Sequence, residues 1–415
     1  MEKFMFSTGI ECSYPTIQHG HHRVDELETT GHYARWQEDF QLTHDMGITH
    51  LRYGIPYYTA NPARGVYDWS FMDETLAEMR RLNIEPMIDL CHFGMPDWLG
   101  NSFQNPEFCE AFADYSAVFA ARYPWIKFYT PVNEIFVCAK FSALYGWWNE
   151  QETTDATFIT SVKHMAKASL LAQDRILQIQ PNAVFLQSES TEFTHTMSAR
   201  PEIQQKAAWE NQVRFLGLDF LYGHPVHNNI MTWLLENGLT MDEYQWFMNQ
   251  SPKLHERGII GTDYYITNER MLDEDGSVQH VGDCLGWYVL AMDYYNRYRK
   301  PLMYTETNLR EESNAVGWLW KQWQNILRMR DDGIPVLGFT WYSLCDQVDW
   351  DTALREPNLN INPLGLYDLN RQIRLVGKAY RGLIERFNYL PNHLPEELLD
   401  VSELAGMPMD MERIA

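Results

Sequence analysis

The 415-residue chain has few cysteines and few basic residues, and each shortage narrows the functions it can have. Its six cysteines are scattered and form no CxxC pair, so neither a disulfide framework nor a zinc site built on such pairs is expected. Only 33 lysines and arginines stand against 56 aspartates and glutamates, which gives a formal net charge of −23. This charge argues against nucleic acid or an anionic membrane as a partner.

Signals for export and for several kinds of active site are also missing. The N-terminus lacks the apolar stretch of a signal peptide, and no run approaches membrane-spanning length, so we expect a cytoplasmic protein. Without a Gly-x-Ser-x-Gly elbow or a glycine-rich phosphate loop, neither a nucleophilic serine nor a bound nucleotide is expected. His19, His21 and His22 lie close together, but their spacing fits no common zinc motif, so we expect no metal or other cofactor.

Aromatic residues, in contrast, are plentiful. The chain has 15 Trp, 23 Tyr and 20 Phe, within a hydrophobic content of 45%. That content is ample for a large core, and most individual rings are expected to belong to it. Because clefts that bind sugars also use aromatic rings as stacking platforms, the excess is compatible with a carbohydrate site without identifying one.

Short apolar runs alternate with longer amphipathic segments along the whole chain. We predict strands at residues 4–10, 49–54, 85–90, 128–133, 183–187, 259–265, 302–305 and 336–342. Helices are predicted at residues 33–46, 71–82, 106–122, 157–178, 284–297, 315–330 and 375–386. This alternation favours an α/β fold, a single (β/α)8 TIM barrel with helical insertions after strand 5, at about residues 207–237. We assign residues 1–390 to the barrel and 391–415 to a C-terminal tail.

Two glutamates far apart in the chain, Glu134 and Glu306, each end a short apolar run. A charge at the end of a buried strand must be solvated or paired. In a parallel barrel the C-terminal ends of all strands meet at one face, so the two acids should converge there. The other strand ends bring polar and aromatic side chains to the same face: Arg52, His92, Asn133, Tyr264, Tyr265, Trp341 and Tyr342.

Two carboxyl groups at one point suit the cleavage of a glycosidic bond. One protonates the leaving oxygen, while the other attacks or assists at the anomeric carbon. Because two nearby carboxylates cannot both ionise cheaply, the pKa of one rises and supplies a neutral acid. Arg52 and the hydroxyl of Tyr265 would keep Glu306 ionised, and Asn133 is well placed to hydrogen-bond a sugar hydroxyl.

Several blocks of sequence resemble family 1 glycoside hydrolases. Residues 84–99, IEPMIDLCHFGMPDWL, resemble that family's third-strand segment, IEPMVTLYHWDLPQWL. Shorter blocks follow in the family's order: residues 130–134 resemble its TFNEP motif, 261–265 its GINYY, 304–308 its ITENG and 338–350 its GYFVWSLLDNFEW. The resemblance spans residues 6 to about 387. It implies a β-glucosidase-like barrel that hydrolyses β-linked glycosides with retention, through a glycosyl-enzyme intermediate.

By this resemblance Glu134 is the acid/base and Glu306 the nucleophile, with Arg52 and Tyr265 as their polar supports, and Asn133, also counted with the catalytic residues, would hold the sugar. Its implied substrate is a small-molecule or oligosaccharide β-glycoside. The residues expected to contact the sugar are Gln18, His92, Asp263, Trp341, Tyr342, Asp349 and Trp350.

Departures from the family pattern fall mostly where the substrate is chosen. Ile135 replaces the proline after the acid/base, Asp263 stands where the family has Asn, and Asp349 replaces a Glu and is one methylene shorter. Tyr342 occupies the register of the family's stacking Trp. Residues 351–355 lack the Ser and Lys pattern that grips 6-phospho sugars in relatives, so phosphoglycosidase activity is not expected.

Two alternatives stay open at this point. The same residues could transfer the sugar to an acceptor other than water, or act on a different glycone. A barrel that kept its sugar site but lost catalysis would bind glycosides without cleaving them. The sequence is also compatible with a homo-oligomer.

Overall fold

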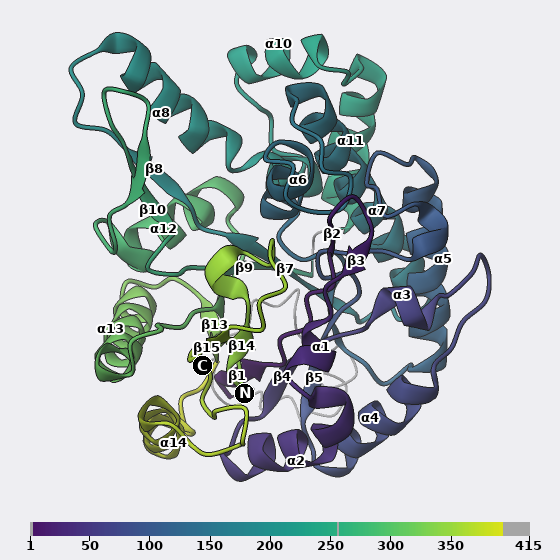
Figure 1. The fold of residues 1–415 in the computed structure, drawn as a ribbon, viewed down its shortest axis with the longest axis vertical. Coiled ribbons are helices and arrows are strands. Elements are labelled where there is room, and N and C mark those ends of the chain that lie inside the picture. The colour runs from purple at the N-terminus through teal and green to yellow at the C-terminus, as the bar shows by residue number, and fades with distance from the viewer. Residues whose placement is uncertain (1–2, 255–256, 393–415) are drawn as a thin grey trace, which may run out of the picture.

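Eight parallel strands hydrogen-bond side by side and close into a barrel (Figure 1). In chain order they are β1 (Met5–Gly9), β4 (His50–Gly54), β5 (Glu85–Asp89), β6 (Phe128–Thr130), β7 (Val184–Ser190), β9 (Gly258–Asp263), β12 (Leu302–Glu306) and β13 (Val336–Trp341). Strand β1 pairs with both β4 and β13, which closes the ring. The computed structural model describes residues 3–254 and 257–392, and the barrel prediction is confirmed at all eight strand positions.

The inside of the barrel is packed with side chains. Residues from strands all round the ring meet there in one apolar cluster: Met5, Met87, Phe128, Val184, Leu186, Ile259, Met303 and Leu337. Because side chains alternate along a strand, the intervening apolar residues face outward and pack against helices. The sequence shows these strands as continuous apolar runs for that reason.

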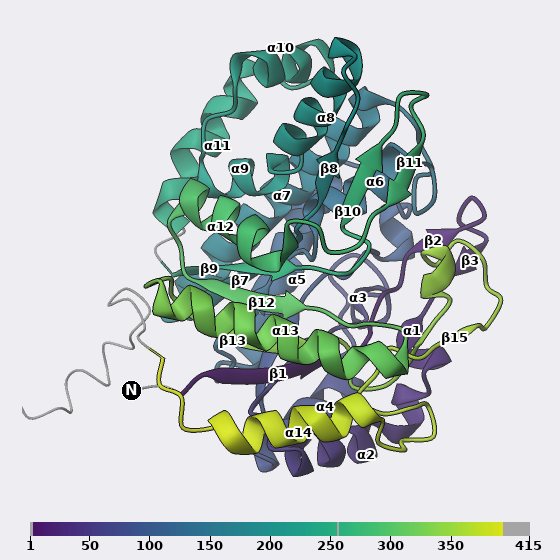
Figure 2. The same ribbon diagram turned by 90° about the vertical axis from the view of Figure 1, so that its left-hand side faces the viewer.

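Helices cover the outside of the barrel. The long ones are α2 (His32–Asp45), α4 (Ser70–Arg81), α5 (Glu107–Arg122), α7 (Asp155–Ile179), α12 (Gly286–Tyr298), α13 (Glu312–Asp331) and α14 (Leu375–Phe387). Figure 2 shows α13 and α14 lying along the outside of the strands. In α14 the buried residues Val376, Tyr380 and Leu383 recur at helical spacing, which is the signal that predicts it.

Shorter elements complete the loops around the barrel. They are β2 (Thr16–Ile17), β3 (His22–Arg23), α1 (Glu26–Thr29), α3 (Tyr57–Ala60), η1 (Asp97–Leu99), β14 (Gln347–Val348), η2 (Trp350–Thr352) and β15 (Ile361–Asn362).

Helix α6 (Ile135–Ala143) follows β6 closely, and the sequence pattern does not predict it. Every residue of α6 except Phe141 is buried. A helix that is apolar on all sides shows no 3.6-residue period, so periodicity cannot reveal it. Its position matters because Glu134 directly precedes its first residue.

The segment after the fifth barrel strand is an insertion, as predicted. Its helices are α8 (Pro201–Val213), α9 (Leu216–Tyr222), α10 (Asn228–Glu236) and α11 (Met241–Leu254). A small sheet of β8 (Phe193–His195), β10 (Glu269–Leu272) and β11 (Val278–His280) lies beside them and was not predicted. Strands this short carry too few residues for a periodic signal. Figure 1 places α8, α10 and α11 at the opposite end of the molecule from α2 and α14.

The end of the described chain is attached to the barrel. Asn392 donates from Nδ2 to the carbonyl of Leu337 at 2.8 Å. The predicted tail lies outside the described residues from residue 393 onward, so the division at residue 390 stays a prediction. Within the part of the chain that the structure describes, no helix is long and apolar enough to cross a bilayer.

Candidate active site

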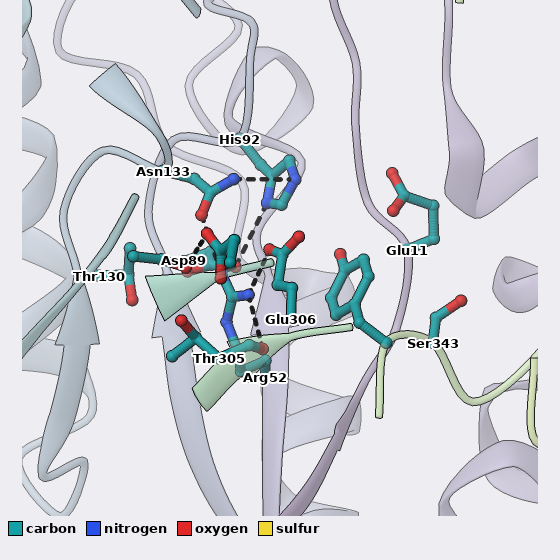
Figure 3. Close-up of polar contacts among 12 residues, drawn as sticks. Glu11, Arg52, Asp89, His92, Thr130, Asn133, Thr305, Glu306 and Ser343 are labelled. Carbon is teal, nitrogen blue, oxygen red and sulfur yellow. Dashed lines mark hydrogen bonds and ion pairs between the residues drawn. The ribbon is translucent and has the colours of Figure 1, made fainter. Parts of the chain in front are cut away.

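Arg52, on β4, lies at the centre of the polar residues at the C-terminal face of the barrel. Its side chain is fully buried and donates to the carboxylate of Glu306. Its Nη2 donates to Asp89 Oδ2 at 3.0 Å and to Asn133 Oδ1 at 2.8 Å. Figure 3 shows Asp89, His92 and Asn133 gathered with Arg52 on one side of Glu306. One guanidinium therefore connects groups from several strand ends.

Glu306 is the last residue of β12, and both of its carboxylate oxygens accept hydrogen bonds. Oε1 accepts from Arg52, and Oε2 accepts from the hydroxyl of Tyr265 at 2.6 Å. Burial raises the pKa of Tyr265 well above its usual range, and the charge of Glu306 raises it further. Tyr265 therefore stays a neutral phenol that can only donate to Glu306, and the two donors fix the position of this carboxylate.

Glu134 lies in a different environment. It sits between β6 and α6 with φ 43°, a left-handed conformation that is uncommon outside glycine and frequent at functional sites. Its side chain receives no hydrogen bond from the residues that the structure describes. Burial raises the pKa of Glu134 well above its usual range, and the charges of Asp263 and Glu306 raise it further. Both effects favour the neutral form of this carboxyl group.

Asp263, at the end of β9, adds a third carboxyl group to this pair. It is fully buried, and Ser188 Oγ donates to its Oδ2 at 2.5 Å. Burial raises the pKa of Asp263 well above its usual range, the charge of Glu306 raises it further, and Arg52 opposes the shift. Asp263, which stands where the family has Asn, therefore influences the pKa of Glu134.

His92 and Asn133 form the polar wall next to Arg52. Asn133 Nδ2 lies 3.3 Å from His92 Nε2, and His92 Nδ1 lies 3.3 Å from Asp89 Oδ2. Burial opposes ionisation of Asp89, but the attraction of Arg52 outweighs it, with help from His92, and its pKa falls below the usual range. Asp89 thus orients two of the predicted site residues.

The neighbouring aromatic residues Trp341 and Tyr342 point to different surroundings. The ring of Tyr342 is stacked with that of His92 at a centroid distance of 6.4 Å, and the guanidinium of Arg52 lies 5.4 Å from its centroid. Trp341 is fully buried and donates from Nε1 to the carbonyl of Leu364 at 2.9 Å. Side chains of consecutive strand residues face opposite ways, so only Tyr342 joins the polar ring.

The sequence model of glycosyl hydrolase family 1 matches residues 13–243, more than half of the chain. The chain belongs to glycosyl hydrolase family 1. The predicted enzyme class and β-glycoside chemistry are therefore confirmed at the level of the family.

Curated relatives of this family 1 hydrolase include phospho-β-glucosidases. Aryl-phospho-beta-D-glucosidase BglH of Bacillus subtilis is 23% identical over 364 residues, which cover 77% of each chain. The 6-phospho-beta-glucosidase AscB of Escherichia coli is 24% identical over 408 residues, covering 81% of this chain and 83% of AscB.

A solved family 1 β-glucosidase from Thermotoga maritima superimposes with a TM-score of 0.77 at 17% identity. The match covers 94% of this chain and 99% of that one. This likeness bears on the fold, and it agrees with the closed eight-stranded barrel.

The remaining predicted sugar contacts of the family 1 hydrolase lie outside the barrel strands, in the segments after β14 and after β2. Both carboxylate oxygens of Asp349 accept backbone N–H groups, from Leu359 at 2.9 Å and Asn360 at 2.8 Å. Trp350 is half-buried against Phe93, at a centroid distance of 6.3 Å. Gln18 lies exposed in the turn between β2 and β3, so the described contacts do not bring it together with the other predicted residues.

Three buried acids near the site were not predicted: Glu11, Asp89 and Glu189. Asp89 ends β5 just as Glu306 ends β12, so the criterion that singles out the two glutamates could have found it. Glu11 follows β1, and its Oε1 accepts from Ser13 N at 3.0 Å. Glu189 lies in β7, where its Oε2 accepts from Phe136 N at 3.1 Å at the start of α6. The sequence predicts that this strand ends at residue 187, two residues before Glu189.

Two groups of side chains have the composition of a metal site: Cys12, Asp89 and His92, and His195, Glu269 and Cys284. In the first, Arg52 already occupies Asp89 Oδ2. In the second, the carboxylate of Glu269 accepts backbone N–H groups from the start of α12, including Leu285 N at 2.8 Å. Both carboxylates are thus engaged in hydrogen bonds that hold the fold.

Proposed function

We propose that this family 1 hydrolase cleaves non-phosphorylated β-glycosides with retention, using Glu306 as the nucleophile and Glu134 as the acid/base. The observation that supports this most directly is the contrast between the two glutamates. Glu306 is held by two donors, whereas the pKa of Glu134 is raised by burial and by nearby carboxyl groups that include Glu306.

In the first step the neutral carboxyl of Glu134 gives its proton to the glycosidic oxygen. Glu306 attacks the anomeric carbon, the bond to the leaving group breaks, and a glycosyl ester forms on Glu306. Arg52 and Tyr265 hold the attacking carboxylate in line, which is a positioning effect.

In the second step Glu134, now ionised, takes a proton from water. The water oxygen attacks the anomeric carbon, the ester to Glu306 breaks, and the sugar leaves with its original configuration. Retention requires the two carboxyl groups to lie about 5–5.5 Å apart.

The charge of the glycone side favours an unphosphorylated sugar. Glu11 and Asp349 are buried acids near Glu26, and burial raises the pKa of Glu26, with the charges of Glu11 and Asp349 adding to the shift. A phosphate group would meet this negative potential. The cation in the segment after Trp350, Arg355, is packed 4.4 Å from the ring of Trp147 and donates to the carbonyl of Thr352.

A matched pair of substrates tests this proposal. Turnover of 4-nitrophenyl β-glucoside and of its 6-phosphate should be compared, and the anomer released first should be identified by proton NMR. We expect the unphosphorylated glucoside to have the higher kcat/KM and the β-anomer to appear first. Faster turnover of the 6-phosphate would overturn the choice of glycone, and initial release of the α-anomer would overturn the double displacement.

A further inference from the structure

A cavity of about 330 Å³ lies between helix α6 and the loops that follow the fifth and sixth barrel strands. Its walls come from α6 and the start of α7 on one side, and from β8, α8, α10 and the β10–β11 hairpin on the other. This volume is at the lower end of the range of small-molecule sites, about 300–1,000 Å³. Its lining includes Phe136, the second residue of α6.

Aromatic rings form much of its lining. Trp209 and Trp233 meet edge to face with their ring centroids 5.1 Å apart, and both are half-buried. Phe158 lies 6.2 Å from Trp233, and Phe136 lies 5.9 Å from Phe158. These rings connect the mouth of the cavity to the first turn of α6, and they suit a flat apolar group.

The charges at the inner end are unbalanced. Lys140 Nζ and Arg270 Nη2 each lie 2.7 Å from the same carboxylate oxygen of Glu192. Burial opposes ionisation of Glu192, but the attraction of Lys140 and Arg270 outweighs it and lowers its pKa to about 2. Two cations therefore share one anion, which leaves a surplus positive charge in a protein whose net charge is −23.

Arg270 also has an unused donor. Its Nε–H is buried and has no acceptor among the residues that the structure describes. A buried donor without a partner costs stability, so a ligand that brings an acceptor to it gains a hydrogen bond. A carboxylate satisfies both the donor and the surplus charge.

The other two acids of the cavity accept hydrogen bonds from residues that also line it. Asp155 accepts from Trp233 Nε1 at 2.8 Å, and Glu210 accepts from the hydroxyl of Thr194 at 2.8 Å. Lys206 also lines the cavity and is exposed. Arg214 pairs with Asp293 outside it at 2.7 Å. Four cations and three acids line the cavity, and Asp293 balances the fourth cation from outside, so the positive excess is confined to the contact of Lys140 and Arg270 with one carboxylate.

We propose that this cavity binds an aromatic ring that carries a carboxylate, with the ring against Trp209 and Trp233 and the carboxylate at Arg270 and Lys140. None of Arg52, Glu134, Tyr265 and Glu306 lines the cavity, so this binding does not rest on the proposed function.

Equilibrium binding to the full-length protein tests the proposal. Titration with 4-hydroxycinnamate, followed by calorimetry and by tryptophan fluorescence, should be compared with titration of the uncharged 4-hydroxycinnamamide. We expect the acid to bind at least about tenfold more tightly, as charge-assisted hydrogen bonds imply. Rising salt should narrow this difference, because part of the site is open to solvent. Equal binding of acid and amide, or no saturable binding of either, would overturn the proposal.

Matched variants assign the effect to the named residues. Arg270→Gln should bring the affinity for the acid down to that for the amide. The double variant Lys140→Met with Glu192→Gln removes one cation and one anion together, so it should keep the preference for the acid. Trp209→Leu should weaken both ligands alike, by a factor that does not depend on charge. An unchanged preference in Arg270→Gln would contradict the proposal, as would competition by glucuronate at equal affinity, which would indicate a sugar site.

Catalysis is measured separately, with 4-nitrophenyl β-glucoside, whose leaving group carries no carboxylate. Turnover of this substrate without binding of 4-hydroxycinnamate would overturn the proposed ligand site and leave the proposed function in place. Binding of 4-hydroxycinnamate without turnover would overturn the proposed function and leave the ligand site in place.

Discussion

The two glutamates at the barrel mouth occupy opposite environments within one polar ring. Glu306, at the end of β12, accepts hydrogen bonds from Arg52 and Tyr265. Glu134, at the start of α6, faces other carboxyl groups, and its pKa is raised by burial and by Asp263 and Glu306. The same side chain type is thus ionised with different ease at the two positions, because neighbouring charges and donors, not residue type, shift its pKa.

Removing the proposed nucleophile should produce the largest effect. In the proposed mechanism Glu306→Ala takes away the atom that attacks the anomeric carbon, so we expect kcat for 4-nitrophenyl β-glucoside to fall by at least about 10⁴-fold. Far-UV circular dichroism and the thermal midpoint should show that the barrel is intact. Glu150→Gln is a matched control, because Glu150 is another shielded glutamate whose pKa is raised by burial. A loss of similar size in the control would mean that buried glutamates act here through stability.

Removing the acid should give a loss that depends on the leaving group. We expect Glu134→Gln to lower kcat/KM by about 10²–10⁴-fold for glycosides with poor leaving groups, and far less for 2,4-dinitrophenyl glycosides, which need no protonation. The wild-type protein should lose activity as pH rises through the raised pKa of Glu134, and the variant should lack this alkaline limb. Equal losses for good and poor leaving groups would contradict the role of acid.

Both glutamates could be found from sequence because each ends an apolar run that the barrel aligns with its neighbours. The same signal marks Asp89 at the end of β5. Other features leave no such trace. Arg270 comes from a strand of only four residues in the loop after the sixth barrel strand, and α6 is buried on nearly all sides, so periodicity shows neither element. Gln18, chosen through the family pattern alone, lies in an exposed turn.

The hydrogen bond from Tyr265 to Glu306 can be tested separately from the one that Arg52 donates. Tyr265→Phe removes the hydroxyl that donates to Oε2 and leaves Arg52 in place, so we expect kcat to fall about tenfold, with a small change in KM. Tyr264→Phe is the control, because the hydroxyl of Tyr264 donates to Glu269 at 2.7 Å and not to Glu306. Equal effects of the two variants on kcat would show that a lost buried hydroxyl, and not its partner, matters.

The sequence does not predict whether the pKa of a buried acid is raised or lowered. The pKa of Glu189 rises to about 8 because burial outweighs the backbone donors Phe136 and Ser190. The pKa of Glu192, a few residues later, falls to about 2 because two cations outweigh its burial. The partners come from α6 and β10, so only the folded chain decides the sign.

The opposite pKa shifts of Glu189 and Glu192 predict opposite effects of pH on stability. Folded Glu189 keeps its proton up to about pH 8, whereas the unfolded chain releases it near 4.5, so the folded state binds more protons in between. Stability therefore falls as pH rises from 4.5 to 8, and Glu189→Gln should remove this loss, making the variant more stable than the wild type at pH 8.

The comparison with Glu192 checks the sign. Its pKa is lowered, so its contribution to stability is present above 4.5 and is lost as pH falls toward 2. Glu192→Gln should destabilise the protein at pH 7 and leave Lys140 and Arg270 without their shared carboxylate. Urea unfolding at pH 5, 7 and 8 measures both variants, with expected changes of a few kcal/mol at most and of opposite sign at pH 8. Changes of the same sign would mean that the lost carboxylate acts through packing and not through its charge.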